Sequence, residues 1–378
     1  MVRPVPGDSC YPPNKGNTTK KLLLISPLGT SDSGGVERVM LYAKQKLESS
    51  GWSVRVLDRK VLYRSCLFKF LRPIDRGAFA PIVEAIAFSR LAAHWACCSD
   101  FIISNGYAAP WLHADLLFCH GTMRGSRFAE KGRTFFWSPE QFLELVAARR
   151  ARSIAAVSSR AGKELARFYS IDSMKIHILP NCIDGMRFFA DTENHGQSGW
   201  NRKREGKIRV LFVGALGNRK GIDRVLGLMN SFYGKNFEFA FVTQTAPDSE
   251  EARLLTGAEM HFKKTLGELP AIYSSCDVMY FPSRYEGFEM VSLESLACGT
   301  PVVGTRVGGM AEMAARNQPG VTVVDNPDDY ETVALALEKS SAEWRRSEKK
   351  QKLHDAAVAE YGIDKWGDRL LRVLDERY

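Results

Sequence analysis

Two carboxylates, Glu286 and Glu294, are separated by seven residues and have the chemistry and spacing of a ligand-binding pair. Glu286 follows an apolar run, residues 277–282, that predicts a buried strand, and residues 290–298 carry helix formers at helical spacing. The first Glu would therefore lie at the carboxyl end of a strand and the second one to two turns into the next helix. Ligands bind at this edge of an open α/β sheet, because helix N-termini with free N–H groups converge there.

The residue type indicates what kind of ligand the pair would hold. A carboxylate accepts hydrogen bonds from two neighbouring hydroxyls, and sugars and riboses present such hydroxyl pairs. Two carboxylates at this spacing therefore suit a ligand with two sugar rings. The spacing alone is a weak signal, because an ordinary loop acid and a solvated helical acid also occur at this separation by chance.

The surrounding segment, PSRYEGFEMVSLESLACGTPVVGTRVGG at residues 282–309, strengthens the functional interpretation. It resembles the donor-binding signature of the retaining glycosyltransferases of family four, which have the GT-B fold and include enzymes of surface-polysaccharide and lipopolysaccharide biosynthesis. The resemblance implies that Glu286 contacts the donor sugar and Glu294 the ribose of the nucleotide. It also implies a donor-binding loop made of Gly287, Phe288, Glu289 and Met290.

One position of this loop departs from the family pattern. The residue after Gly287 and Phe288 is usually Gly or Pro, and here it is Glu289. Main-chain N–H groups of the loop normally approach the sugar hydroxyls. A carboxylate at this position would either point away from the ligand or add an acceptor to the sugar pocket, so the identity of the donor sugar is less well defined.

A second element, VLFVGALGNRKGIDRVL at residues 210–226, predicts a strand ending at Gly214, a loop, and a helix opening near Gly221. The family has a basic residue before a Gly at this place, and its Lys binds the donor diphosphate; Lys220 matches it. An Arg often follows the strand's Gly in the family; this chain has Ala there, and Arg219 would supply the charge. Taken alone, both cations would be interpreted as solvated loop residues.

Two further candidates lie nearer the start of the chain. Gly34 and Gly35 stand between a predicted first strand and a helix that runs to about Ser50, and glycines there let N–H groups approach a phosphate or a sugar. The family has this loop facing the donor diphosphate and the acceptor.

His120 follows the strand at residues 115–119. A lone His after a strand is more often a packing or capping residue, but the family frequently has a His here, near the donor sugar. The resemblance therefore implies catalytic roles for Glu286, Lys220 and His120.

Elements that would position these residues recur in both halves of the chain. Short apolar strands alternate with longer helices, which predicts parallel sheets covered on both faces. The expected fold is α/β and GT-B: two Rossmann-like domains facing across a cleft, with C-terminal helices packing back on the first domain. Strands are expected near residues 21–27, 53–58, 100–104, 115–119, 153–158, 175–179, 207–213, 237–243, 260–262, 278–282, 301–304 and 321–324. The expected divisions are a disordered tail at 1–20, an acceptor-side domain at 21–184, a linker at 185–205, a nucleotide-sugar domain at 206–340 and C-terminal helices at 341–378.

Composition narrows the class of protein further. No stretch reaches the ~18 uninterrupted apolar residues of a membrane-spanning helix, and the proline-rich first twenty residues lack the apolar core of a signal peptide. The eight cysteines are scattered without a C-x-x-C pair, so neither a disulfide framework nor a zinc site is indicated. No D-x-D motif stands at a strand end. A cytoplasmic enzyme that needs no metal or other cofactor is expected, with a nucleotide-diphosphate sugar as its donor substrate.

Positive charge is concentrated in the first half. Residues 1–184 carry 26 Lys and Arg against 15 Asp and Glu, a net +11, whereas residues 185–378 carry 26 against 28, a net −2. Apolar residues interleave with four basic ones in the first half, which predicts a short basic amphipathic segment on the inner face of the cytoplasmic membrane. The four basic residues are Arg64, Lys69, Arg72 and Arg76. Apolar side chains facing the core with basic ones facing water would explain the same pattern.

The expected activity follows from the resemblance. A hexose would pass from a GDP- or UDP-linked donor to a hydroxyl of a glycan or lipid-linked glycan with retention, the acceptor attacking on the leaving group's own face while the departing diphosphate takes its proton. Two other classes stay open. A nucleotide-sugar epimerase shares the fold and the donor. A nucleic-acid-binding protein is suggested by the pI near 9.1, but the sequence lacks the aromatic and basic motifs of the known modules.

Overall fold

The computed structural model describes residues 19–32, 34–65, 80–131, 138–190, 206–232 and 236–375. The first of its two sheets contains β1 (Lys21–Ile25), β2 (Ser53–Leu57), β3 (Phe101–Asn105), β4 (Leu116–Cys119), β5 (Ser153–Ala156) and β6 (Ile176–Ile178). The second contains β7 (Ile208–Val213), β8 (Phe237–Thr243), β9 (Glu259–Phe262), β10 (Val278–Phe281), β11 (Val302–Thr305) and β12 (Val321–Val324). Each strand lies within two residues of its predicted bounds.

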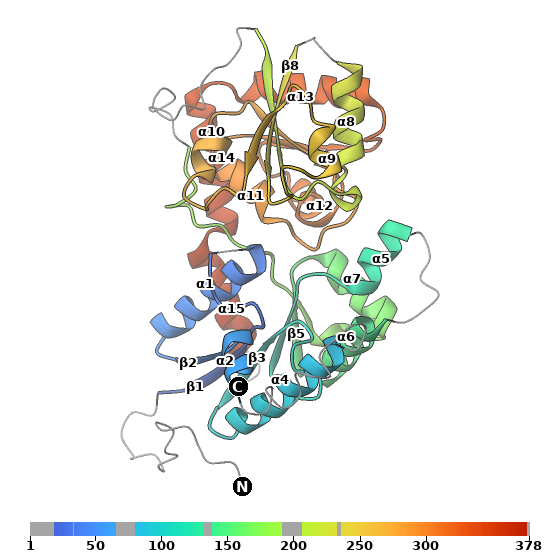
Figure 1. Ribbon diagram of the computed structural model, residues 1–378. Helices are drawn as coiled ribbons and strands as arrows, with labels where there is room; N and C mark the ends of the chain where they lie inside the picture. The colour runs from blue at the N-terminus through green and yellow to red at the C-terminus, as the bar shows by residue number, and fades with distance from the viewer. Residues whose placement is uncertain are drawn as a thin grey trace.

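The two sheets lie one above the other in Figure 1. The strand order is β2-β1-β3-β4-β5-β6 in the first and β12-β11-β10-β7-β8-β9 in the second. Every pair of neighbouring strands is parallel. The predicted pair of Rossmann-like α/β halves is therefore confirmed. Because all strands of a sheet point the same way, their carboxyl ends share one edge, and that edge is where side chains for ligand binding are brought together.

Helices connect the strands in both halves. The first half has α1 (Gly35–Ser49), α2 (Arg59–Arg64), α4 (Ala80–Ala96), α5 (Met123–Lys131), α6 (Pro139–Arg150) and α7 (Ser159–Tyr169). The second has α8 (Ile222–Ser231), α9 (Glu250–Arg253), α10 (Leu269–Ser274), α11 (Met290–Ala297), α12 (Gly308–Ala315) and α13 (Tyr330–Trp344), followed by α14 (Ser347–Tyr361) and α15 (Ile363–Asp375). Local sequence explains several starts: Ser138 caps α6 with a capping box, and the Ser158 hydroxyl accepts from the Ala161 N–H at the start of α7.

Apolar cores cover both faces of each sheet, which explains why inner strands such as β4 and β10 are apolar along their whole length. On the second sheet, Leu293 of α11 and Leu353 of α14 belong to one core cluster, whereas Val225 of α8 and Leu337 of α13 belong to another. The first sheet is covered in the same way, by α1 and α15 on one face and by α4, α6 and α7 on the other.

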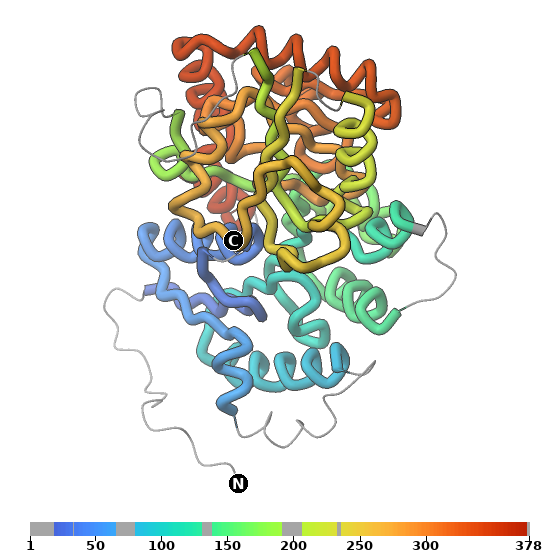
Figure 2. The backbone as a smooth tube through the Cα atoms, turned by 45° about the horizontal axis from the view of Figure 1, so that its top comes forward, coloured from blue at the N-terminus to red at the C-terminus, as the bar shows by residue number. Residues whose placement is uncertain are grey.

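The C-terminal helices return from the second half to the first, as Figures 1 and 2 both show. Helix α14 packs on α11, and α15 packs on α1. Trp366 of α15 is buried beside Phe118 of β4, with ring centroids 6.5 Å apart, and Lys46 Nζ of α1 lies 2.7 Å from the Asp368 carboxylate. The predicted return is therefore confirmed for α15. Residues 1–18 of the expected tail and 191–205 of the expected linker lie outside the described residues.

Within the described ranges, no helix combines the length and the apolar character needed to cross a bilayer.

Candidate active site

The strand order explains how distant parts of the sequence meet. Glu286 comes after β10, and Lys220 lies in the short 3-10 turn Asn218–Lys220 that follows β7, the neighbour of β10 in the second sheet. His120 directly follows β4 of the first sheet. The carboxyl edges of both sheets face each other between the two halves (Figure 1), so residues from both are placed around one region.

Glu286 is held by two cations. Its Oε1 lies 2.7 Å from Lys220 Nζ and 3.1 Å from Arg219 Nη1, and its side chain is 11% exposed. Arg219 Nη1 also donates to the Tyr285 carbonyl at 3.1 Å. Lys220 and Arg219 are adjacent in sequence, yet the tight turn lets both reach the same carboxylate. Arg219 therefore occupies the place at which its charge adds to that of Lys220, as the sequence suggested.

Two glycines shape this turn. Gly214 has φ +151 at the end of β7, and the Lys220 stem packs over it. Gly221 has φ +78, and a Cβ there would collide with the Pro282 carbonyl. The positive φ strains an L side chain at both positions, and at Gly221 a Cβ also has no space. The second glycine holds the turn against the end of β10. The sequence analysis did not predict that position 221 requires Gly. The position of Gly221 between Lys220 and the start of α8 is the sequence signal for this requirement.

Glu294 is placed differently from Glu286. Its carboxylate is 1% exposed, and its two oxygens accept from different residues: Oε1 from Arg38 Nη2 and Oε2 from the Tyr273 hydroxyl at 2.8 Å. Arg38 belongs to α1, so this ion pair joins the two halves. The expectation that both carboxylates face one ligand remains a prediction, since Glu294 is enclosed by these partners. Each oxygen keeps a lone pair that a ribose hydroxyl could use.

Arg38 is the main residue that the sequence analysis missed. It lies three residues after Gly35, is 6% exposed, and its Nε and Nη1 atoms have no hydrogen-bond partner among the described residues. Its carboxylate partner lies 256 residues away in the chain. Sequence periodicity alone predicts that a charged residue such as Arg38 lies on the outer face of α1. It cannot predict an ion-pair partner in the other half of the chain.

The Arg38 and Glu294 pair should dominate the stability of the contact between the halves. We expect Arg38→Met to lower the free energy of unfolding by about 3–5 kcal/mol, because it leaves the Glu294 charge buried and unpaired. The double variant Arg38→Met with Glu294→Leu should recover most of this loss. Urea unfolding of the three proteins measures it. A single variant that costs less than about 1 kcal/mol would contradict the burial of the pair.

Glu289, the residue that departs from the family pattern, faces the start of α12. Its Oε2 accepts from the Gly309 N–H at 2.8 Å, and the side chain is buried. Gly308 is required beside it, because a Cβ there would lie 2.6 Å from both Glu289 Oε2 and the Glu286 Cβ. Burial, and secondarily the charge of Glu286, raise the pKa of Glu289 to about 8. The carboxyl group of Glu289 therefore caps a helix next to Glu286.

The raised pKa of Glu289 makes stability depend on pH. The native state keeps this proton up to about pH 8, whereas the Glu289 carboxyl of the unfolded chain releases it at its ordinary pKa of 4.5. The stabilising contribution of this group is therefore lost as pH rises from 4.5 through 8. We expect Glu289→Gln to flatten the fall in unfolding free energy between pH 5 and pH 8.5 and to exceed wild type by about 1–3 kcal/mol at the upper end. Urea titrations at both pH values measure this, with the exposed Glu331→Gln as control. A wild-type curve no steeper than that of Glu289→Gln would contradict the assignment.

His120 presents a neutral imidazole at the edge of the first sheet. Both ring nitrogens are buried and have no hydrogen-bond partner among the described residues, and the ring stacks on Phe118 with centroids 6.2 Å apart. Burial lowers the pKa of His120 to about 4. The ring therefore offers one donor and one acceptor at neutral pH. Buried polar groups normally have partners, so two unpartnered nitrogens favour a role toward a ligand over a packing role.

The loops carrying the remaining candidates touch across the two halves. A Cβ on Gly287 would collide with the His120 carbonyl, which explains Gly at this position. A Cβ on Gly35 would lie 3.1 Å from Met290 Cγ. The Phe288 carbonyl accepts from Asn181 Nδ2 at 2.8 Å. Gly34 is the extended N-cap of α1 and has the Glu37 carboxylate packed against it. The loop from Gly287 to Met290 is thus enclosed by the first half.

Among the described residues, no group of three or more His, Cys, Asp and Glu side chains is arranged to hold a metal ion.

Comparison with known proteins agrees with the fold. The family model "Glycosyltransferase Family 4" matches residues 33–185, and "Glycosyl transferases group 1" matches residues 207–340. The solved structure of sucrose-phosphate synthase from Thermosynechococcus elongatus has a TM-score of 0.73 at 18% identity, covering 94% of this chain and 98% of its own. WaaG, a glycosyltransferase involved in lipopolysaccharide biosynthesis, has a TM-score of 0.69 at 18% identity, covering 92% and 98%. Fold and matches together place the chain among the GT-B glycosyltransferases.

Similarity to curated proteins covers shorter stretches. The D-inositol 3-phosphate glycosyltransferase of Pseudarthrobacter chlorophenolicus is 31% identical over 195 residues, which is 46% of this chain and 44% of the relative. The first curated relatives are matched over 37% to 56% of their own length. The family matches therefore define the class of enzyme, and these partial similarities do not define the donor or the acceptor of this chain.

Proposed function

We propose that the protein transfers a hexose, with retention, from a GDP- or UDP-linked donor to a hydroxyl of a glycan or lipid-linked glycan, as in the biosynthesis of surface polysaccharide. One observation carries the proposal: Lys220 and Arg219 converge on Glu286 at the carboxyl edge of the second sheet, opposite His120 with its unpartnered nitrogens. The cations suit the phosphates of a diphosphate-linked sugar, and the carboxylate and the neutral imidazole suit the hydroxyls of its sugar.

Each residue has a role in this mechanism. Lys220 and Arg219 bind the donor diphosphate and stabilise the charge that grows on it as the glycosidic bond breaks. Glu286 accepts hydrogen bonds from the sugar hydroxyls, and His120 orients the same sugar. The acceptor hydroxyl attacks on the face that the diphosphate leaves, and the departing diphosphate oxygen takes its proton. The positive charges of Lys220 and Arg219 offset the negative charge of the diphosphate, and the proposal includes no metal ion.

The test separates this activity from the epimerase alternative. The protein is incubated with UDP-glucose, UDP-galactose, UDP-N-acetylglucosamine and GDP-mannose, each with and without a mixture of alkyl glycosides, in the presence of EDTA. We expect one of the four donors to give nucleotide release and an α-configured product. Both should appear only when an acceptor is present. A change in the donor sugar without any acceptor would favour the epimerase.

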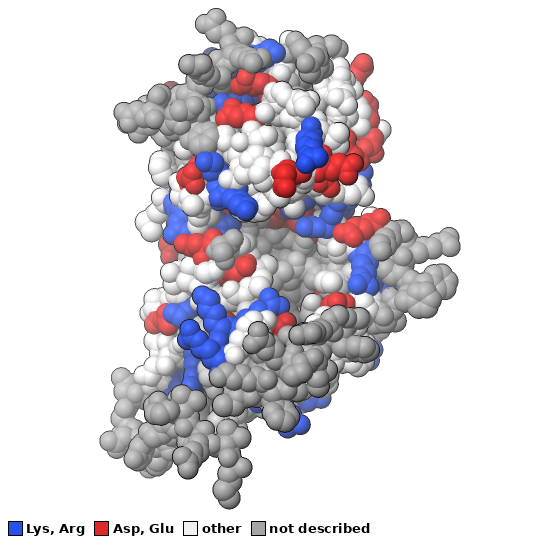
Figure 3. Space-filling model, in the orientation of Figure 1, with Lys and Arg blue, Asp and Glu red and all other residues white. Residues whose placement is uncertain are grey.

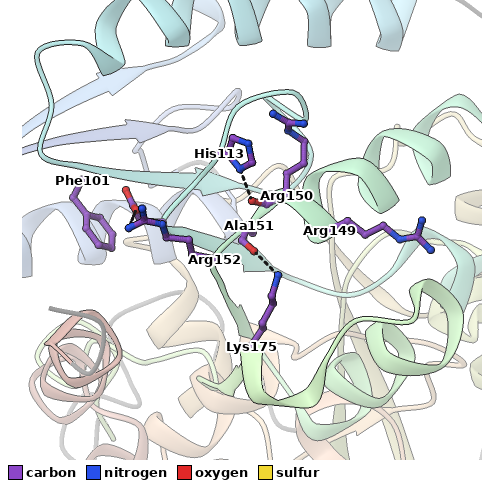
Figure 4. A pocket seen from close by; sticks show the side chains of 8 residues that line it. Phe101, His113, Arg149, Arg150, Ala151, Arg152 and Lys175 are labelled. Atoms are coloured by element: carbon purple, nitrogen blue, oxygen red, sulfur yellow. Dashed lines mark hydrogen bonds and ion pairs between the residues drawn. The ribbon is translucent and has the colours of Figure 1, made fainter.

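A peripheral contact with anionic membrane is also proposed, supported by the excess of basic residues in the first half. On the face shown in Figure 3, a group of basic side chains lies on the first half, and side chains of both signs occur on both halves. Arg64 ends α2, while Lys69, Arg72 and Arg76 lie outside the described residues. A separate cavity of about 490 Å³ at the opposite edge of the first sheet is also basic (Figure 4). Its cations are Arg149, Arg150, Arg152 and Lys175.

The two basic groups allow a matched experiment. Changing Arg64, Lys69, Arg72 and Arg76 to Gln should reduce co-sedimentation with anionic vesicles at low salt, because each basic residue near the surface contributes about 1 kcal/mol. The control changes the four cations of the basic cavity to Gln, which removes the same charge elsewhere. An equal loss in both variants, or none in either, would contradict a contact through the Arg64 segment.

A further inference from the structure

Two short segments, one from each half of the chain, lie in contact at the candidate active site. Residues 120–122 follow β4, and residues 285–287 come soon after β10. A Cβ on Gly121 would lie 3.3 Å from the Tyr285 hydroxyl oxygen and 3.4 Å from Gly287 Cα. The segment that begins with the candidate His therefore contacts the segment that contains the first candidate Glu.

The side chain of Tyr285 extends from the second half into the first. Its hydroxyl accepts a hydrogen bond from the Thr122 N–H at 3.0 Å and donates to Glu164 Oε2 of α7 at 2.8 Å. The Arg160 guanidinium lies over the ring, 4.7 Å from its centroid. Tyr285 is 5% exposed, yet the apolar clusters of described residues that cover the two sheets do not include it. The contact between the halves, and not the core of either half, therefore buries this side chain.

Further hydrogen bonds hold the partners of this hydroxyl in place. Glu164 Oε2 also accepts from Thr122 Oγ1 at 2.6 Å, and Glu164 Oε1 accepts from Arg160 Nε at 3.0 Å. The Gly125 N–H of α5 donates to Thr122 Oγ1 at 2.9 Å. Burial, and secondarily the charge of Glu164, raise the pKa of Tyr285 above its ordinary value, so its hydroxyl keeps the proton that it donates. A buried polar network whose members all have partners is rigid.

Neighbouring residues in the second segment have partners in different halves. Glu286 pairs with two cations of its own half, whereas Tyr285, directly before it, is anchored in the first half. His120 lies two residues before Thr122, which donates to the tyrosine hydroxyl. The hydrogen bonds of Tyr285 therefore set the position of the candidate carboxylate relative to the candidate imidazole.

We propose that Tyr285 is a positioning residue for the transfer reaction, and that it fixes Glu286 relative to His120. It does so through the hydrogen bonds of its hydroxyl with Thr122 and Glu164. The inference rests on the proposed function and deepens it, because it names the contact that aligns the sugar-binding groups of the two halves. Alignment matters for rate, since a misplacement of about 1 Å can cost about 100-fold in turnover. The cations that bind the diphosphate belong to the second half and do not depend on this contact.

Tyr285→Phe removes the hydroxyl and keeps the ring. With whichever of the four nucleotide sugars is active, we expect turnover to fall about 10- to 100-fold. The Kd of UDP or GDP, measured by calorimetry, should change by less than about twofold, because the diphosphate-binding cations stay in place. Exchange of the Thr122 amide hydrogen with deuterium, measured by mass spectrometry, should be about tenfold faster or more, because this N–H loses its acceptor.

The matched control is Tyr280→Phe. It removes another buried tyrosine hydroxyl, whose acceptor at 3.4 Å is the Pro327 carbonyl of the same half. Turnover, nucleotide affinity and exchange at Thr122 should all stay at the wild-type level. A loss of turnover in Tyr285→Phe that equals its unfolded fraction under assay conditions, or that equals the loss in Tyr280→Phe, would overturn the inference.

Variants of Glu164 test the same contact from the first half. Glu164→Gln keeps an acceptor oxygen for the Tyr285 hydroxyl, so it should retain more turnover than Glu164→Ala. The double variant Tyr285→Phe with Glu164→Ala should be about as active as the more impaired single variant, because both changes break one contact. Additive losses would overturn the inference. If Tyr285→Phe does not fold, equal turnover of Glu164→Gln and Glu164→Ala would overturn it.

Failure of the proposed function gives a different result. A wild type that transfers no sugar contradicts the proposed function, and exchange at Thr122 then decides whether the contact itself exists. An active wild type contradicts this inference alone if Tyr285→Phe keeps wild-type turnover or wild-type exchange at Thr122, or if it loses nucleotide affinity instead of turnover.

Discussion

Glu286→Ala is expected to lower turnover about 10- to 100-fold, because it removes a charged hydrogen-bond acceptor worth roughly 1.5 to 3 kcal/mol. Nucleotide affinity should not fall, because Lys220 and Arg219, which both contact Glu286 in the free protein, are then released toward the diphosphate. Steady-state kinetics with the donor varied separate the two effects: turnover falls and KM for the donor stays equal or decreases.

The control for this prediction is Glu331→Ala, which removes an exposed acid from the first turn of α13. It should leave turnover unchanged. A Glu286→Ala protein with wild-type turnover would remove the carboxylate from the chemistry. A raised donor KM at constant turnover would place it in nucleotide binding instead.

Lys220→Ala should have the larger effect on turnover, about 100- to 1,000-fold, because it removes a preorganised positive charge at the position where the leaving diphosphate becomes more negative. Its effect on folding should be small, about 1 kcal/mol or less, since Arg219 still pairs with Glu286 after the change. Lys220 is the better placed cation, with its side chain 16% exposed against 39% for Arg219. Arg219→Ala should therefore cost less turnover.

Turnover and urea unfolding of Lys220→Ala, Arg219→Ala and Lys220→Arg are compared for this purpose. Partial recovery in Lys220→Arg supports a role of charge at this position. If the activity lost by Lys220→Ala equals the fraction of protein unfolded under assay conditions, then Lys220 is structural and the assignment is wrong.

The sequence predicted the strands well because of how parallel sheets are buried. A strand covered on both faces is a short apolar run between polar loops, and β4 and β10 illustrate this clearly. Residues directly after such strands could then be placed at one edge by topology alone. That is why Glu286, Lys220 and His120 were named together although 166 residues separate the first from the last.

The contacts between the two halves could not be predicted from the sequence. The ion pair of Arg38 with Glu294, and the contact of Gly287 with the His120 carbonyl, depend on how two independently patterned sheets dock. Local periodicity has no information about such distant partners. The direction of the Glu289 side chain also could not be predicted, because the loop before α11 could turn it toward the sugar or toward α12. The hydrogen bond from the Gly309 N–H shows that it turns toward α12.

Ligand-induced thermal stabilisation tests the central claim most directly. The full chain is heated with UDP, GDP and a panel of their sugars, alongside Lys220→Ala. We predict that one nucleotide sugar stabilises the wild type, by about 2.7 kcal/mol at a hundredfold excess over its Kd, and that the variant loses most of this gain. No stabilisation of the wild type by any nucleotide or nucleotide sugar at millimolar concentration would contradict the account.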